Sequence, residues 1–223
     1  MRFGTLLGAC LVAGGLAAGA LTPAMGQAQG SPDSAAEARQ RAEETAVGEA
    51  FVGVRAALRD RDGAAVLASL SQEDRQRLDR IRAAAGEGKG LSALGPSERF
   101  AALGLRHYMK PADIKRRDAA GLAEYALDQR WLDPRDIGRA GLSRVRVQGD
   151  RASGTLVIDN KPQIVPANFV KEQGRWKLDL SPTLQMTDAL IRTQAGLTRR
   201  TEDQVIVEIL ERASGRKVTA SLQ

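Results

Sequence analysis

Few side chains in this chain are of the types that perform acid–base or nucleophilic chemistry. The sequence holds one cysteine, Cys10, and one histidine, His107. A metal site built from several histidines is therefore excluded, and any Ser-His-Asp arrangement would depend on His107 alone. His107 lies near the end of a predicted helix, where a positive charge is favourable, so a half-exposed helix-end residue is the favoured interpretation. Catalysis by His107 as a general base is the alternative.

The carboxylates and glycines point to no further chemistry. Asp159 and Asp179 lie on or beside predicted strands, and each is more simply a turn residue or an outward-facing strand residue, because carboxylates are seldom buried. The glycines of residues 86–96 follow no strand and lack a Gly-Lys-Ser/Thr sequence, so they do not predict a phosphate-binding loop. We expect neither a cofactor nor a metal.

The N-terminus has the pattern of an export signal. Arg2 precedes an apolar, Gly/Ala-rich run over residues 3–21, and Pro23 breaks this run ahead of small residues suited to a signal peptidase. Cleavage after Ala28 is favoured, with cleavage after Gly26 as the alternative. Residues 1–28 are therefore predicted to be a signal peptide, and the mature protein is expected to be periplasmic or secreted, without a transmembrane span.

Two other interpretations of this segment remain open. The sequence Leu7-Gly8-Ala9-Cys10 has the small residues that precede a lipid-modified cysteine, although the apolar run continues past Cys10. A retained membrane anchor is disfavoured by the Gly and Ala content. If residues 1–28 are removed, no thiol remains for a disulfide, so the mature chain must be stabilised by a true hydrophobic core.

The charge pattern is typical of a solvated surface. The formal net charge is +6, and arginines are mixed closely with Asp and Glu. This distribution and the predicted export both argue against a nucleic-acid partner. The densest basic cluster is formed by Arg106, His107, Lys110, Lys115, Arg116 and Arg117. A solvated turn is favoured here, and attraction to anionic headgroups or an acidic partner is the alternative.

The first half of the mature chain is predicted to be helical. After a disordered leader over residues 29–33, Ser34 and Glu37 have the spacing of a capping box. Val47, Phe51, Val54 and Leu58 then form one apolar stripe on a helix over residues 35–60. Further helices are expected over residues 64–70, 71–85, 97–109 and 111–132, with a mobile loop at 86–96.

The sequence period changes to that of strands after Gly141. Four strands joined by tight turns are predicted, the first around residues 144–147 and the others at 153–158, 163–172 and 176–180. Pro166 within the third strand implies an edge position or a bulge. The fold class is therefore α+β, with N-terminal helices packed on a curved antiparallel sheet.

The C-terminal residues 183–223 form a predicted helical extension. A capping box at Thr201 and Gln204 precedes an apolar face that includes Val205, Ile206 and Leu210. A lone helix cannot keep such a face in water, so it is expected to pack on the domain, on a partner or in a homodimer.

A long predicted helix is followed by Arg59-Asp60-Arg61-Asp62-Gly63. Later in the chain, Ala167-Asn168-Phe169-Val170 leads through a Gly turn to Arg175-Trp176-Lys177-Leu178. These segments resemble the NTF2-like superfamily. The resemblance covers a domain at residues 34–182. It implies a cone in which helices pack on a strongly bent sheet and leave a pocket at the wide end. Some members are cyclases, isomerases or hydrolases, and others bind ligands or partners without catalysis.

Four aromatic residues are the candidates for a pocket wall: Tyr125, Trp131, Phe169 and Trp176. Packing between helices and sheet is their favoured role, and contact with an apolar ligand is the alternative. We therefore predict an exported, non-catalytic domain that binds a small apolar or amphipathic ligand or an envelope protein. The alternative is an NTF2-like enzyme that uses His107 or a pocket carboxylate as general base.

Overall fold

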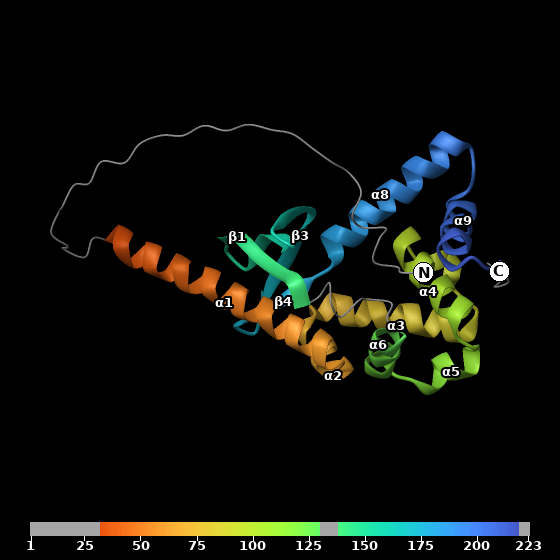
Figure 1. Ribbon diagram of the computed structural model, residues 1–223, viewed down its shortest axis with the longest axis horizontal. Helices are drawn as coiled ribbons and strands as arrows, with labels where there is room; N and C mark the ends of the chain where they lie inside the picture. Colours follow the sequence, from red (N-terminus) through yellow and green to blue (C-terminus); the bar gives the residue numbers. More distant parts are fainter. Residues whose placement is uncertain (1–31, 130–137, 219–223) are drawn as a thin grey trace.

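The computed structural model describes residues 32–129 and 138–218. Their elements follow in the order α1 (Pro32–Asp60), α2 (Gly63–Ser69), α3 (Gln72–Glu87), η2 (Leu91–Ala93), α4 (Pro96–Tyr108), α5 (Pro111–Arg116), α6 (Ala119–Asp128), β1 (Ala140–Gln148), β2 (Arg151–Ile158), β3 (Lys161–Glu172), β4 (Arg175–Asp179), α8 (Ser181–Thr198) and α9 (Glu202–Ser214). The fold is α+β, as predicted. Two regions are distinct: a layer made by α1 and the sheet, and a cluster of helices that α8 connects to the sheet (Figure 1).

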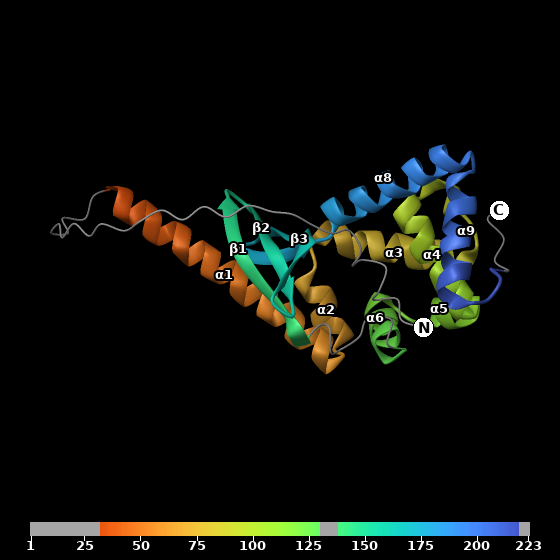
Figure 2. The same ribbon diagram turned by 45° about the horizontal axis from the view of Figure 1, so that its top comes forward.

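The sheet is a four-stranded antiparallel meander in the order β1-β2-β3-β4. Its alternation puts apolar side chains on the face toward α1, where Val47 and Phe51 pack against Phe169, Trp176 and Leu142. The predicted apolar stripe of α1 is confirmed at Val47, Phe51 and Val54, all of which are buried. The sheet is not strongly curled, so the expected strong bend is not observed (Figure 2).

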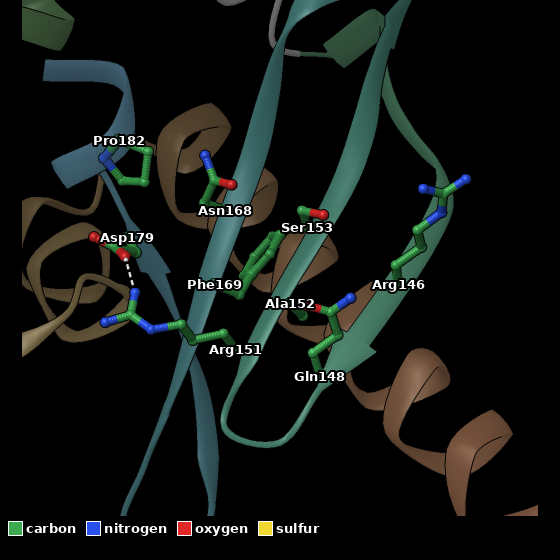
Figure 3. A pocket seen from close by; sticks show the side chains of 9 residues that line it. All are labelled: Arg146, Gln148, Arg151, Ala152, Ser153, Asn168, Phe169, Asp179 and Pro182. Carbon is green, nitrogen blue, oxygen red and sulfur yellow. Dashed lines mark hydrogen bonds and ion pairs between the residues drawn. The ribbon is translucent and has the colours of Figure 1, made fainter. Parts of the chain in front are cut away.

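The opposite face of the sheet carries several polar side chains (Figure 3). The pairing brings one residue of each strand into a row across it: Arg146, Ser153, Asn168 and Asp179. An antiparallel sheet with one packed face commonly has such a polar outer face.

Two irregularities in the ladder correspond to features of the sequence. The β2–β3 register shifts between Thr155 and Val157, beside the pair Thr155–Pro166. The bulge predicted from Pro166 is therefore confirmed, and the edge alternative is wrong because β3 is an interior strand. A second bulge lies in β1 between Ser143 and Arg146, where Arg144 adopts φ +51.

Side chains and backbone of neighbouring segments contact both edges of the sheet. On the β1 side, Gln40 Nε2 donates to Val147 O at 3.3 Å and Arg55 Nη1 donates to Ala140 O at 2.7 Å. On the β4 side, Leu70 forms a parallel bridge with Leu178, and Ser71 N donates to Leu178 O at 2.9 Å.

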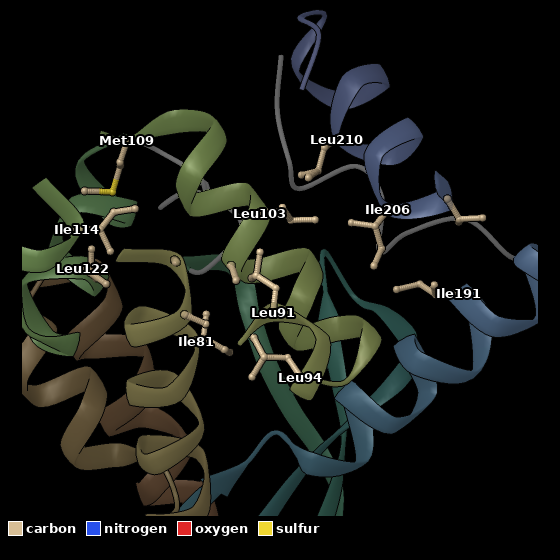
Figure 4. Close-up of a cluster of buried hydrophobic side chains, with 14 of the residues drawn as sticks. Ile81, Leu91, Leu94, Leu103, Met109, Ile114, Leu122, Ile191, Ile206 and Leu210 are labelled. Carbon is tan, nitrogen blue, oxygen red and sulfur yellow. The ribbon is translucent and has the colours of Figure 1, made fainter. Parts of the chain in front are cut away.

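The helical cluster has its own core, formed by α3, α4, α5, α6, α8 and α9 (Figure 4). Leu103, Ile114, Ile206 and Leu210 are each 0% exposed. The apolar face of the C-terminal helix is therefore buried on the domain itself. The capping box at Thr201 and Gln204 is also confirmed, with both reciprocal hydrogen bonds present.

A buried carboxylate joins the two regions. Asp74 of α3 is 1% exposed and accepts hydrogen bonds from Ser71 Oγ at 2.8 Å and from the Leu180 N–H, just after β4, at 2.7 Å. Arg77 forms an ion pair with Asp74, and its Nε lies 3.2 Å from Glu98 of α4. This network fixes the end of the sheet to two helices of the cluster.

Several predicted boundaries differ from the structure. The helix expected over residues 111–132 is broken because Asp118 caps a new helix, accepting from the Gly121 N–H at 2.8 Å. The helix expected from residue 35 begins at Pro32, so Ser34 lies within its first turn. The segment at 86–96 is anchored, since Leu91 and Leu94 are buried in the helical core. In the described ranges no helix combines the length and apolarity of a membrane span.

Candidate functional site

An apolar groove runs between α1 and the edge strand β1. It has a volume of about 520 Å³ and is lined by Thr45, Gly48, Glu49, Phe51, Val52, Arg55 and Leu142. A smaller hollow of about 70 Å³ follows it along α1 and shares Val52 and Arg55 with it. Val52 is 59% exposed although it is a large apolar residue. The groove is thus an accessible apolar surface beside the core of the layer.

The local sequence of α1 creates this groove. Gly48 has no side chain, and a Cβ at this position would meet nothing within 4 Å. Phe51 and Leu142 pack into the layer and form the floor, while Val52 lies one residue outside the buried stripe. A missing side chain between packed neighbours leaves a recess in the surface.

The polar side chains of the groove lie at its borders. Arg55 donates to two backbone carbonyl oxygens, Ala140 O at 2.7 Å and Gly138 O at 3.3 Å. Within residues 32–129 and 138–218 its guanidinium has no carboxylate partner, so its positive charge is not neutralised by an ion pair. The groove therefore combines an apolar floor with the cation of Arg55 and the carboxylate of Glu49.

Phe169 and Trp176, two of the predicted site residues, lie together in the α1–sheet layer. Phe169 is 1% exposed, and Trp176 Nε1 donates to Glu43 Oε2 of α1 at 2.9 Å. Lys171 Nζ lies 2.5 Å from Glu43 Oε1. The hydrogen bonds from Lys171 and then Trp176 hold the pKa of Glu43 below its ordinary value. Both aromatic residues pack α1 on the sheet, the role favoured from the sequence.

The other two predicted aromatic residues are not part of this layer. Tyr125 belongs to α6 and packs against the helical core, with the Arg117 guanidinium 5.3 Å from its ring centroid. Trp131 lies outside the described residues. The structure therefore brings together two of the four aromatic candidates.

His107, the candidate general base, lies in the last turn of α4, as the sequence predicted. Its Nε2 is 2.9 Å from Ser214 Oγ at the end of α9, and its ring meets Tyr108 edge-on. Burial lowers the pKa of His107, the nearby charge of Arg216 lowers it further, and Glu211 acts in the opposite direction. His107 lines none of the hollows described above.

Sequence reasoning missed the groove. Two residues of α1 could have indicated it: Val52, an apolar residue beside the buried stripe, and Gly48, which has no side chain to fill the surface next to it. No cluster of three or more potential metal ligands occurs in the described parts of the chain. Comparisons with protein-family models, with curated proteins and with solved structures find no match for this chain.

Proposed function

We propose that this protein is an exported, non-catalytic binding protein whose α1–β1 groove holds the apolar part of a small amphipathic molecule. The observation that carries the proposal is the accessible apolar groove of about 520 Å³ between Phe51, Val52 and Leu142. Small-molecule sites commonly have volumes of about 300–1,000 Å³ and mostly apolar linings with a few polar groups.

Arg55 indicates which headgroup the proposed ligand carries. Among the described residues the Arg55 guanidinium is hydrogen-bonded to neutral carbonyl oxygens alone, so its charge can be neutralised by an anionic headgroup. The apolar chain of the ligand would cover Val52, and removing apolar surface from water contributes about 25 cal/mol per Å². The proposed ligand is therefore an anionic amphiphile such as a fatty acid, with its headgroup at Arg55 rather than at Glu49.

A relationship to the NTF2-like superfamily is part of this proposal. The order of elements supports it, because a long N-terminal helix and further helices precede a four-stranded meander. The ligand site proposed here lies at the edge between helix and sheet rather than inside a cone. Export is supported by the pattern of residues 1–28.

Substitution of Gly48 tests the groove directly. Gly48→Leu would project a side chain into the groove without meeting a neighbour. Gly53→Leu is the matched control, since it lies on the same helix, also has free space at Cβ and lines neither hollow of the groove. Both changes raise helix propensity by a similar amount. Any difference between the two variants therefore reports occupancy of the groove.

The measurement is displacement of the fluorescent probe 1-anilinonaphthalene-8-sulfonate by dodecanoate from the mature protein. We expect Gly48→Leu to weaken dodecanoate binding by about tenfold or more, and Gly53→Leu to leave it unchanged. Equal binding by the two variants, or no binding by the parent protein, would overturn the proposal. An envelope protein would then be the remaining occupant, to be sought by cross-linking.

The alternative function is catalytic and is favoured by one observation, the 2.9 Å contact between His107 Nε2 and Ser214 Oγ. A histidine in contact with a hydroxyl is the pairing that activates a nucleophile. Ser214 Oγ also accepts from the Arg216 N–H at 3.2 Å and so takes part in the turn after α9. Hydrolysis of p-nitrophenyl acetate that is abolished in both His107→Gln and Ser214→Ala would establish this alternative.

A further inference from the structure

The face of the sheet opposite α1 contains a further hollow, of about 230 Å³. It lies opposite the face packed on α1, because Arg146 alternates with Val145 and Val147 of the packed face. Its polar lining includes the cross-strand row Arg146, Ser153, Asn168 and Asp179. Every strand of the sheet thus contributes at least one polar side chain to this hollow.

The sizes of the side chains explain why the surface is hollowed here. Ser153 and Asn168 of the two central strands are shorter than Arg146 and Arg151, and these arginines and Pro182 border the hollow (Figure 3). Ala152 and Phe169 contribute to the floor because their side chains turn to the α1 side. The floor is therefore rigid sheet, which is a good support for precise recognition.

The charges of the hollow are unequal at its two ends. Asp179 is 7% exposed, its Oδ1 accepts from the Ser181 N–H at 3.0 Å, and Arg151 Nη1 lies 3.5 Å from its Oδ2. Arg146 is exposed and has no hydrogen bond or ion pair with another described residue. Arg151 and Asp179 offset each other, so among the described lining residues the charge of Arg146 is the one without a counter-charge.

We propose that this hollow binds a small oxyanion that carries neighbouring hydroxyl groups, such as a sugar acid or a sugar phosphate. Arg146 would take the carboxylate or phosphate oxygens, for which a guanidinium has matching donors. Ser153 and Asn168, each with donor and acceptor capacity, would bond the hydroxyl groups. Asp179, fixed by Arg151 and the Ser181 N–H, would accept from a hydroxyl at the other end.

This inference is independent of the proposed amphiphile groove, since the two sites lie on opposite sides of the sheet. The proposed combination of an anionic group and hydroxyl groups follows from the residues of the cross-strand row. A purely anionic ligand would leave the acceptors of Asp179 and Asn168 unused, and a neutral polyol would leave Arg146 without a counter-charge.

Isothermal titration of the mature protein with four probes tests the proposal: glucuronate, glucose 6-phosphate, glucose and inorganic phosphate. We expect at least one of the first two to bind, and to bind more tightly than glucose and inorganic phosphate. Comparison of glucuronate with glucose 6-phosphate distinguishes a carboxylate from a phosphate ligand. No binding of either with a Kd below about 1 mM would overturn the inference. Equal binding of inorganic phosphate would also overturn it, because the hydroxyl contacts would then contribute nothing.

A matched pair of variants locates the site. Arg146→Gln removes the uncompensated charge and should weaken binding about tenfold or more. Arg175→Gln removes the same charge from the same sheet, at the start of β4 and outside the hollow, and should have no effect. Ser153→Ala should weaken binding without changing net charge. Equal losses in the two arginine variants would mean general attraction to a basic protein and would contradict the proposal.

Discussion

The helical cluster and the α1–sheet layer bury their apolar residues to different extents. Among the described residues the cluster has fifteen buried residues in one core, whereas the layer has five, with half-buried neighbours such as Leu142 and Leu178 around them. Both hollows proposed as binding sites belong to the layer. The region with the smaller core thus carries both proposed binding sites.

The geometry of one helix on a sheet accounts for the difference. A helix with its side chains is about 10–12 Å wide. The four strands of this sheet, spaced about 4.8 Å apart, are wider than that. One helix therefore cannot fill the whole packed face, and a recess remains between α1 and the edge strand β1. In the cluster, by contrast, α4 is packed between α3, α8 and α9, so little apolar surface remains open.

The largest expected effect concerns the joint between the two regions. Asp74→Ala leaves the guanidinium of Arg77 without its buried partner and the Leu180 N–H without an acceptor. Removing one member of a buried ion pair costs about 3–5 kcal/mol. Glu73→Gln is the control, because Glu73 pairs with the same arginine but its side chain is 66% exposed, and it should cost less than about 1 kcal/mol. Urea unfolding measures both.

The same urea experiment also tests whether Asp74 couples the unfolding of the two regions. With Trp131→Phe as background, so that Trp176 is the one tryptophan, we expect fluorescence and circular dichroism to give a single transition. Loss of Asp74 should separate the two curves. Coincident curves in Asp74→Ala with an unchanged midpoint would contradict the role of Asp74 as a joint.

The second prediction compares the two cores. Leu210→Ala in α9 removes a side chain that is 0% exposed, and it should cost about 2–5 kcal/mol. Leu142→Ala removes the same atoms from a half-buried position beside the groove, so the loss should be clearly smaller. Urea midpoints of the two variants give the comparison. A larger loss at Leu142 would mean that the layer, and not the cluster, dominates stability.

The smallest expected effect is a pH dependence from His107. Its pKa is lowered in the folded protein, mainly by burial, from the ordinary value of 6.5. The unfolded chain therefore binds this proton more readily, and folding stability falls as pH drops from about 6.5 through the lower folded pKa. His107→Gln should remove this part of the decline between about pH 7 and pH 5. Identical urea midpoints against pH in both proteins would show that burial of His107 does not affect folding.

The elements with strong periodicity could be predicted from the sequence. The stripe of Val47 and Phe51, the strands around tight turns and the capping box at Thr201 each depend on local spacing, which sequence records directly. The break at Asp118 was missed because an N-cap residue inside a continuous helical pattern looks like an ordinary surface residue.

The sites could not be predicted in the same way. Arg146 and Asn168 come from different strands, and only the register of the sheet puts them in one row. A sequence shows that each faces outward but not which residue lies opposite. The groove likewise depends on where α1 crosses the sheet, which is decided by packing between distant segments such as Glu43 with Lys171 and Trp176.

The contacts at the two edge strands of the sheet affect how molecules of this protein can associate. A free strand edge offers backbone groups to a second chain and can seed ordered aggregates. Here Gln40 and Arg55 occupy carbonyl oxygens at both ends of β1, a bulge interrupts its middle, and Leu70–Ser71 pairs with β4 on the far side. Neither edge presents an unbroken ladder. The molecule can therefore expose an apolar groove next to a sheet without offering a template on which further copies would polymerise.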